Sequence, residues 1–255
     1  RNTTAGRPRH RIASQAPPAM TQSGRTTSLR ITEIFHSLQG ETSRSGLPTV
    51  FVRLTGCPLR CSWCDTEYSF TGGTTQALDD ILAEVAGYHC PTVCVTGGEP
   101  LAQKGCLALL TALCDAGYSV SLETSGALDI AGVDPRVSRI VDLKAPGSGE
   151  EARNLLSNIP LLTLRDELKL VLASEADYEW AKARIAEHRL TERCPVLMAP
   201  VQGQLKPAEL AAWILRDRLP VEKDNGNIRL HSLIDHAGRG GTVHHIDAEI
   251  GRAHV

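Results

Sequence analysis

Short apolar runs alternate with longer amphipathic segments along most of the chain. Runs that alternate apolar with polar residues, or that are rich in β-branched residues, predict strands. Apolar residues spaced three and four apart predict helices with one buried face. The expected strands lie at 29–38, 49–54, 92–96, 118–123, 139–143, 167–172 and 195–199. The expected helices lie at 75–88, 176–188 and 207–219. A further helix is marked by Leu107, Leu110 and Cys114 and is expected to end at a cap formed by Gly117.

Strands that alternate with helices predict βα units and a parallel sheet. Segments rich in polar residues and glycine follow several strands, at 57–66, 97–100, 123–126 and 142–147. In βα barrels the sites are built from the loops after the strands, and a full eightfold barrel takes about 250 residues. The core expected here, 29–221, is shorter. We therefore predict an α/β fold, an open and partial TIM-like barrel of about six parallel strands. A Rossmann fold is the alternative, but no predicted strand is followed by G-x-G-x-x-G.

Three cysteines crowd into the loop after the strand at 49–54. Cys57, Cys61 and Cys64 have the spacing C-x3-C-x2-C. A structural zinc site usually has four ligands, and no fourth Cys or His follows closely. Three thiolates can instead hold three irons of a cubane cluster and leave the fourth iron open to a small molecule. A zinc site and three unrelated core cysteines remain alternatives.

The other five cysteines lie in or beside apolar stretches, and we interpret them as small buried hydrophobic residues. They are Cys90, Cys94, Cys106, Cys114 and Cys194. They are not laid out as in a small secreted scaffold, which favours a reducing, cytoplasmic setting.

The cysteine motif, together with Gly97-Gly98-Glu99-Pro100 after the next strand, resembles the radical S-adenosylmethionine (SAM) superfamily. The resemblance implies a [4Fe–4S] cluster on Cys57, Cys61 and Cys64. Its open iron would bind the amino and carboxylate groups of SAM, and an electron from the cluster would release a hydrogen-abstracting radical. Glycine lets the main chain come close to a ligand, and the resemblance implies that Gly98 lies beside SAM. The full set of SAM contacts implied by the resemblance is Trp63, Cys64, Asp65, Gly98, Glu123, Ser125, Asp142, Leu143 and Lys144.

Two further segments resemble the 7-carboxy-7-deazaguanine synthase family within that superfamily. They are His36-Ser37-Leu38-Gln39-Gly40-Glu41, combined with Arg53, and Cys64-Asp65-Thr66. An arginine suits this family's substrate because its planar fork pairs bidentately with a carboxylate. A hydroxyl oxygen suits Mg²⁺, and the resemblance gives Thr66 that role. The substrate contacts implied are Leu38, Gln39, Gly40, Arg53 and Thr96.

This resemblance implies a carbon–nitrogen lyase of queuosine biosynthesis. The enzyme would convert 6-carboxy-5,6,7,8-tetrahydropterin to 7-carboxy-7-deazaguanine and release ammonia. It would use the cluster, SAM and Mg²⁺, take electrons from a flavodoxin-type donor and form a homodimer. A glycyl-radical activating enzyme has the same cysteine spacing but is not expected to carry LQGE and CDT together. A zinc-binding protein without enzymatic activity is the third hypothesis.

Composition and charge exclude few functions. The net charge is −2 and the hydrophobic content 42%, so nothing points to nucleic acid or to an anionic membrane surface. No apolar run approaches the ~20 residues of a transmembrane helix.

Both ends of the chain differ from the middle. We expect residues 1–28 to be a disordered leader, with 1–19 not native because the first methionine is Met20. Residues 29–221 are expected to form the radical SAM core domain. Residues 222–255 are expected to be an atypical tail, partly disordered or artefactual. The segment 227–236 there fits poorly to the strand with Gln, His and Lys that usually closes this family.

Overall fold

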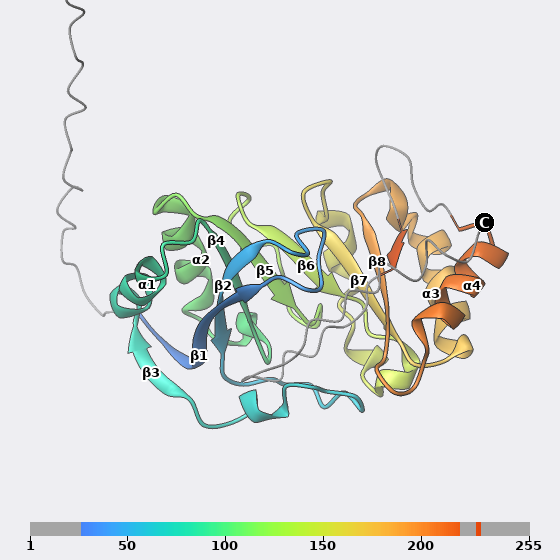
Figure 1. Cartoon of the computed structure of the whole chain (residues 1–255), viewed down its shortest axis with the longest axis horizontal. Helices are drawn as coiled ribbons and strands as arrows, with labels where there is room; N and C mark the ends of the chain where they lie inside the picture. The colour runs from blue at the N-terminus through green and yellow to red at the C-terminus, as the bar shows by residue number, and fades with distance from the viewer. Residues whose placement is uncertain (1–26, 220–227, 231–255) are drawn as a thin grey trace, which may run out of the picture.

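A nine-stranded sheet organises the part of the chain that the structure describes (Figure 1). The computed structural model describes residues 27–219 and 228–230. The strand order is β3-β1-β2-β4-β5-β6-β7-β8-β9. The expectations for the leader and the tail concern mostly residues outside these ranges, and they stay predictions.

The first three strands are antiparallel. β1 (Ser28–Leu38) pairs with β2 (Pro48–Leu54) on one side and with β3 (Thr74–Ala77) on the other. The sequence predicted β1 and β2 but not β3, since the apolar pattern had placed a helix from residue 75. The helix α1 (Leu78–Gly87) begins only at Leu78. The backbone of Thr74–Ala77 instead completes a ladder with Ser28–Ile31, and this tertiary pairing overrides the local pattern.

From β2 onward every neighbouring pair of strands is parallel. This confirms the open, partial barrel. The predicted strands agree with the observed ones to within about one residue, as expected where β-branched runs are bounded by turn residues. The parallel strands after β2 are β4 (Thr92–Gly97), β5 (Ser119–Thr124), β6 (Ser138–Asp142), β7 (Glu167–Leu172), β8 (Val196–Pro200) and β9 (Ile228–Leu230). β9 lies beyond the core boundary predicted at 221 and pairs with Val196–Met198.

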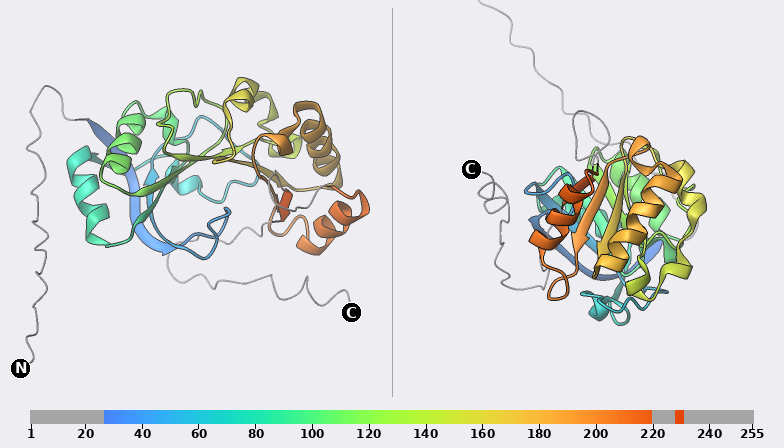
Figure 2. Two further views of the ribbon diagram at one scale, coloured as in Figure 1. Left: turned by 90° about the horizontal axis from the view of Figure 1, so that it is seen from above. Right: turned by 90° about the vertical axis from the view of Figure 1, so that its right-hand side faces the viewer.

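Helices cover the convex face of the curved sheet (Figure 2). Besides α1 they are α2 (Cys106–Asp115), α3 (Glu175–His188) and α4 (Pro207–Arg216). No helix in the described ranges combines the length and the apolar character needed to span a membrane.

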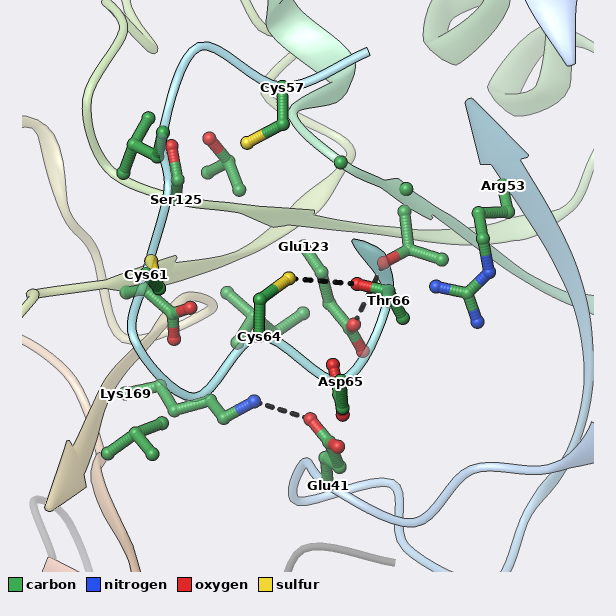
Figure 3. Close-up of a pocket in the computed structure, with 18 of the residues that line it drawn as sticks. Glu41, Arg53, Cys57, Cys61, Cys64, Asp65, Thr66, Glu123, Ser125 and Lys169 are labelled. Carbon is green, nitrogen blue, oxygen red and sulfur yellow. Dashed lines mark hydrogen bonds and ion pairs between the residues drawn. The ribbon is translucent and has the colours of Figure 1, made fainter. Parts of the chain in front are cut away.

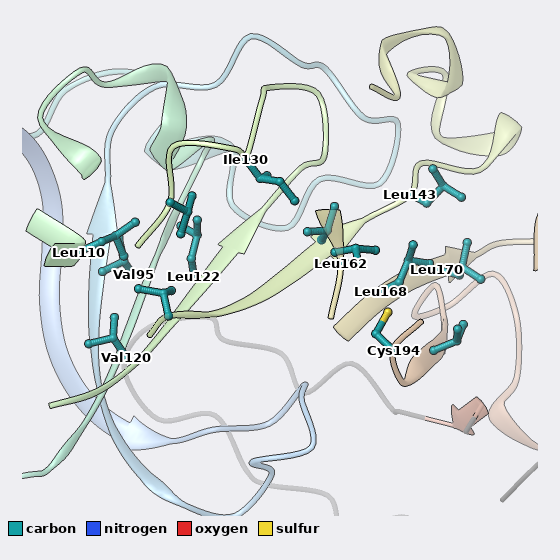
Figure 4. Packing of buried hydrophobic residues seen from close by; sticks show 14 of the residues in the cluster. Val95, Leu110, Val120, Leu122, Ile130, Leu143, Leu162, Leu168, Leu170 and Cys194 are labelled. Atoms are coloured by element: carbon teal, nitrogen blue, oxygen red, sulfur yellow. The ribbon is translucent and has the colours of Figure 1, made fainter. Parts of the chain in front are cut away.

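The hydrophobic core lies between the sheet and these helices. Figure 4 shows Val95, Val120 and Leu122 of neighbouring strands beside Leu110 of α2. The buried face of α2 differs from the prediction: Leu107 is 38% exposed and Cys114 is half-buried, while Leu109 and Leu113 are buried. The predicted face was turned by about one residue, because a helix made almost wholly of small and apolar residues has no clear polar side. Four of the five remote cysteines are buried as expected, namely Cys90, Cys94, Cys106 and Cys194.

Candidate active site

A pocket opens where the parallel strands end (Figure 3). Side chains from the ends of β2, β4, β5, β6 and β7 form its wall, and the loop after β2 lies across it. Carboxyl ends of parallel strands meet at one edge of a sheet, so the polar segments that follow them in the sequence gather here.

The three motif cysteines lie around this pocket together. Cys57, Cys61 and Cys64 all line it (Figure 3), and burial raises the pKa of the Cys57 and Cys61 thiols. Within the described ranges, no three His, Cys, Asp or Glu side chains gather closely enough to hold one metal ion. Three thiols spread around a pocket suit a cubane cluster, in which each thiolate binds a separate iron. The donor set, three thiols that line one pocket, therefore fits the group that the motif predicts.

The glycine turn at the end of β4, Gly97–Gly98, packs against the loop that carries the three cysteines (57–66), here called the cysteine loop. The Gly98 amide donates to the Leu54 carbonyl at 3.2 Å, and the Glu99 amide donates to the Gly56 carbonyl at 2.8 Å. A Cβ on Gly98 would lie 2.4 Å from the Gly56 oxygen and 2.7 Å from the Cys57 Cβ. Gly98 lines the pocket as predicted, and the structure adds a second reason for glycine: the cysteine loop packs directly on it.

We therefore expect Gly98→Ala to displace Cys57 and to lower the iron and sulfide bound after anaerobic reconstitution to less than about half of the wild-type content, since backbone atoms cannot yield as a flexible side chain does. Gly87→Ala is the matched control. Gly87 ends α1, and among the described residues nothing lies within 4 Å of a Cβ built there. Wild-type iron content in the Gly98 variant would refute this role.

Glu99 ties the end of β4 to the end of β5. Its fully buried carboxylate accepts hydrogen bonds from the Thr124 hydroxyl at 2.9 Å, the Ser125 amide at 2.7 Å and the Ser125 hydroxyl at 2.5 Å. The hydroxyl of Ser125, predicted to contact SAM, is therefore already engaged, although the residue lines the pocket.

Asp142, the last residue of β6, forms an ion pair with Lys144 on the pocket wall. Lys144 Nζ donates to Asp142 Oδ2 at 2.6 Å. Burial alone would raise the pKa of Asp142, but Lys144 and Lys169 bring it below its usual range. Burial alone would lower the pKa of Lys144, but Asp142 and Cys61 raise it. The pair thus stays charged beside Cys61. Leu143 between them is buried in the core and is not among the residues that line the pocket, and its SAM contact stays a prediction.

A second group of charges lies across the pocket, and the sequence had predicted only part of it. Lys169 of β7 donates to Glu41, which follows the predicted Gln39-Gly40 segment. Glu123 of β5 accepts from Gln39 Nε2 and from Thr96 Oγ1, both at 3.1 Å. Gln39, Thr96 and Glu123 were predicted site residues, whereas Glu41 and Lys169 were missed as contacts.

Lys169 is the central cation of this group. Burial alone would lower its pKa, but Glu41, Asp142 and Glu123 raise it above its ordinary value. Burial and the nearby Glu41 raise the pKa of Glu123, and Lys169 and the hydrogen bonds from Gln39 and Thr96 oppose this. Lys169 thereby links the Glu41 side of the pocket to the Asp142 side.

The other predicted substrate contacts are distributed unevenly. Arg53 is buried on the pocket wall, and its Nε donates to Glu33 at 2.8 Å. Gln39 and Gly40 are buried in the turn after β1, where the Gln39 amide oxygen accepts from the Gly40 amide at 2.8 Å. Leu38, by contrast, is 46% exposed at the end of β1.

The remaining predicted residues come from the cysteine loop. Trp63, Asp65 and Thr66 line the pocket, and the Thr66 hydroxyl lies 3.8 Å from Cys64 Sγ (Figure 3). The structure thus brings most of the predicted residues to one place, while their individual roles stay predictions.

Comparisons with known proteins point to one family. The sequence model of the radical SAM superfamily matches residues 51–146. A 7-carboxy-7-deazaguanine synthase of Chlorobaculum tepidum is 49% identical over 209 residues, covering 81% of this chain and 94% of the relative. One from Koribacter versatilis is 42% identical, covering 76% and 92%.

The fold is shared with a solved structure, that of QueE from Escherichia coli. The two chains superpose with a TM-score of 0.64 at 24% identity, over 81% of this chain and 94% of the other. On the identity and coverage of its curated relatives, the chain belongs to the 7-carboxy-7-deazaguanine synthase family of the radical SAM superfamily.

Proposed function

We propose that the protein is a carbon–nitrogen lyase, a radical SAM 7-carboxy-7-deazaguanine synthase. It converts 6-carboxy-5,6,7,8-tetrahydropterin to 7-carboxy-7-deazaguanine with release of ammonia. The observation that supports this most is the single pocket shared by the three cysteines, the Asp142–Lys144 pair and Arg53. This pocket belongs to a chain whose relatives named 7-carboxy-7-deazaguanine synthase match it over nearly their full length.

The cysteine side of the pocket serves the cofactors. Cys57, Cys61 and Cys64 would hold the [4Fe–4S] cluster, and Asp142 and Lys144 offer an acceptor and a donor for the ammonium and carboxylate of SAM. When bound, the cluster and SAM supply the hydrogen-abstraction chemistry.

The opposite side binds and orients the substrate. Arg53 offers a cation for the pterin carboxylate. Glu123 and Thr96 offer hydrogen-bonding groups for the polar edge of the ring, and Gln39 fixes Glu123 through its amide. Phe51, Leu59 and Phe70 also line the pocket and limit the water around the reacting atoms.

Thr66 is the proposed protein ligand of Mg²⁺. Its hydroxyl lies beside Cys64 on the pocket wall, and Mg²⁺ typically takes few protein ligands together with substrate and water. Thr66→Ala should raise the Mg²⁺ concentration that gives half-maximal turnover by at least about tenfold. It should leave the visible absorption of the cluster intact. Thr66→Ser keeps the hydroxyl and is the control. Loss of the cluster absorption in the alanine variant would make Thr66 a structural residue instead.

One assay tests the function against the alternatives. Anaerobically reconstituted protein is incubated with the carboxypterin, SAM, Mg²⁺ and dithionite, and the products are identified by mass spectrometry. A deazapurine carboxylate that forms over many turnovers supports the proposal. SAM cleavage without any deazapurine would favour another radical SAM enzyme, such as a glycyl-radical activating enzyme, which needs a protein partner. The flavodoxin-type donor, the homodimer and the cytoplasmic location stay predictions.

A further inference from the structure

Arg53 enters the pocket with one edge of its guanidinium already engaged. The side chain is 5% exposed, and its Nε donates to Glu33 Oε1 at 2.8 Å. The rings of Phe35 and Tyr68 each lie 5.8 Å from the Arg53 Cζ. Figure 3 shows the guanidinium end directed toward the pocket interior. The Nε edge is thus held from the sheet side, and the Nη1–Nη2 edge is presented to the pocket.

A β-bulge in β1 brings Glu33 to this place. Ile31 is paired with Leu54, and regular antiparallel pairing would then set Thr32 opposite Arg53. The register shifts between Ile31 and Glu33, so Glu33 stands opposite Arg53 instead. The Thr32 hydroxyl bonds to the Thr55 hydroxyl at 2.7 Å. Bulges next to active sites commonly re-aim a side chain, and here the re-aimed group is the carboxylate.

The same carboxylate oxygen also contacts the cysteine-loop side of the molecule. Tyr68 lies in the short 3-10 helix η1 (Glu67–Ser69), and its hydroxyl donates to Glu33 Oε1 at 2.8 Å. Glu33 therefore accepts from two elements at once. This fixes the arginine of β2 relative to the segment that follows the three cysteines.

We propose that Glu33 is a positioning residue that presents the Nη1–Nη2 edge of Arg53 to a carboxylate on the substrate. The proposal rests on the proposed function, in which that substrate is a carboxypterin. A free arginine side chain loses rotamer entropy when it is fixed, and a pre-organised fork reduces that loss on binding. A buried guanidinium also needs a nearby opposite charge. Glu33 supplies that charge and leaves the terminal edge for the ligand, so the substrate carboxylate binds end-on.

The test compares two ligands in protein that cannot turn over. Binding of 6-carboxytetrahydropterin, and of tetrahydropterin without the carboxylate, is measured with SAM present and reductant absent. Glu33→Ala should weaken binding of the carboxypterin about tenfold or more, as for loss of a hydrogen bond to a charged group. Glu33→Gln keeps an acceptor for Nε and should weaken it less than about threefold. Both variants should bind the ligand without the carboxylate as the wild type does.

Glu84→Ala, which removes an exposed carboxylate of α1, is the matched control. Glu33→Ile, a residue that suits a strand, replaces the alanine variant if that variant has a lowered unfolding midpoint. Equal losses for both ligands would mean that Glu33 only maintains the fold, and no loss for the carboxypterin would also overturn the proposal.

Arg53→Ala separates this inference from the proposed function. If that variant loses its preference for the carboxylated ligand while Glu33→Ala keeps it, only the role of Glu33 fails. If Arg53→Ala keeps the preference, the carboxylate does not bind at Arg53 and the assigned substrate orientation fails.

Discussion

Replacing Lys169 with Met removes the cation shared by Glu41, Glu123 and Asp142, and we expect turnover to fall at least about hundredfold because both sides of the pocket shift. Lys169 is only 11% exposed at its side chain, and removing one partner of a buried ion pair costs about 3 kcal/mol of unfolding free energy. Urea unfolding of the reconstituted protein and the product assay measure the two effects.

Lys169→Arg keeps the charge and should recover most of the stability but only part of the turnover, because the broader guanidinium alters the geometry. Lys104→Met, at an exposed position, is the control. If Lys169→Met matched this control in both measurements, the charge group would not organise the pocket.

Cys61→Ala should abolish turnover, a loss of at least about 10⁴-fold, since most of the enzymatic acceleration would disappear with the cluster. Cys61 lies between Cys57 and Cys64 in the sequence, and its side chain lines the pocket. We expect iron and sulfide to fall well below the wild-type content after anaerobic reconstitution, with loss of the visible absorption.

Cys114→Ala is the matched control for this variant. Cys114 is half-buried on α2, away from the residues that line the pocket. It should keep both the iron content and the turnover. A Cys61 variant that retains a full cluster, or a wild-type protein that binds stoichiometric zinc without iron, would contradict the assignment of the thiols.

Much of the fold could be predicted because the parallel strands are short β-branched or apolar runs bounded by turn residues. β7 shows how the pattern works: Leu168 and Leu170 face the core, so Lys169 and Val171 face the pocket. β3 was missed because Thr74–Ala77 forms a strand only by pairing with β1. Such long-range pairing leaves no periodic signal in a four-residue segment.

The candidate site could be assembled from the sequence only where motifs follow strands. The cysteine loop, Gly98 and the Asp142–Lys144 pair meet because parallel strands end at one edge of the sheet. The ion pair between Glu41 and Lys169 joins residues far apart in the sequence. In the sequence, only the charged residue Lys169 at a pocket-facing position of β7 could have indicated this ion pair. The role of Glu33 depends on a bulge, which no local pattern revealed.

The most direct test of the central claim is the electron paramagnetic resonance spectrum of the reduced, anaerobically reconstituted protein, recorded with and without SAM. Three thiolates that leave one iron open predict the signal of a reduced [4Fe–4S] cluster that changes when SAM binds. A cluster signal unaffected by SAM, or no iron-based signal from protein that is folded and loaded with metal, would contradict it.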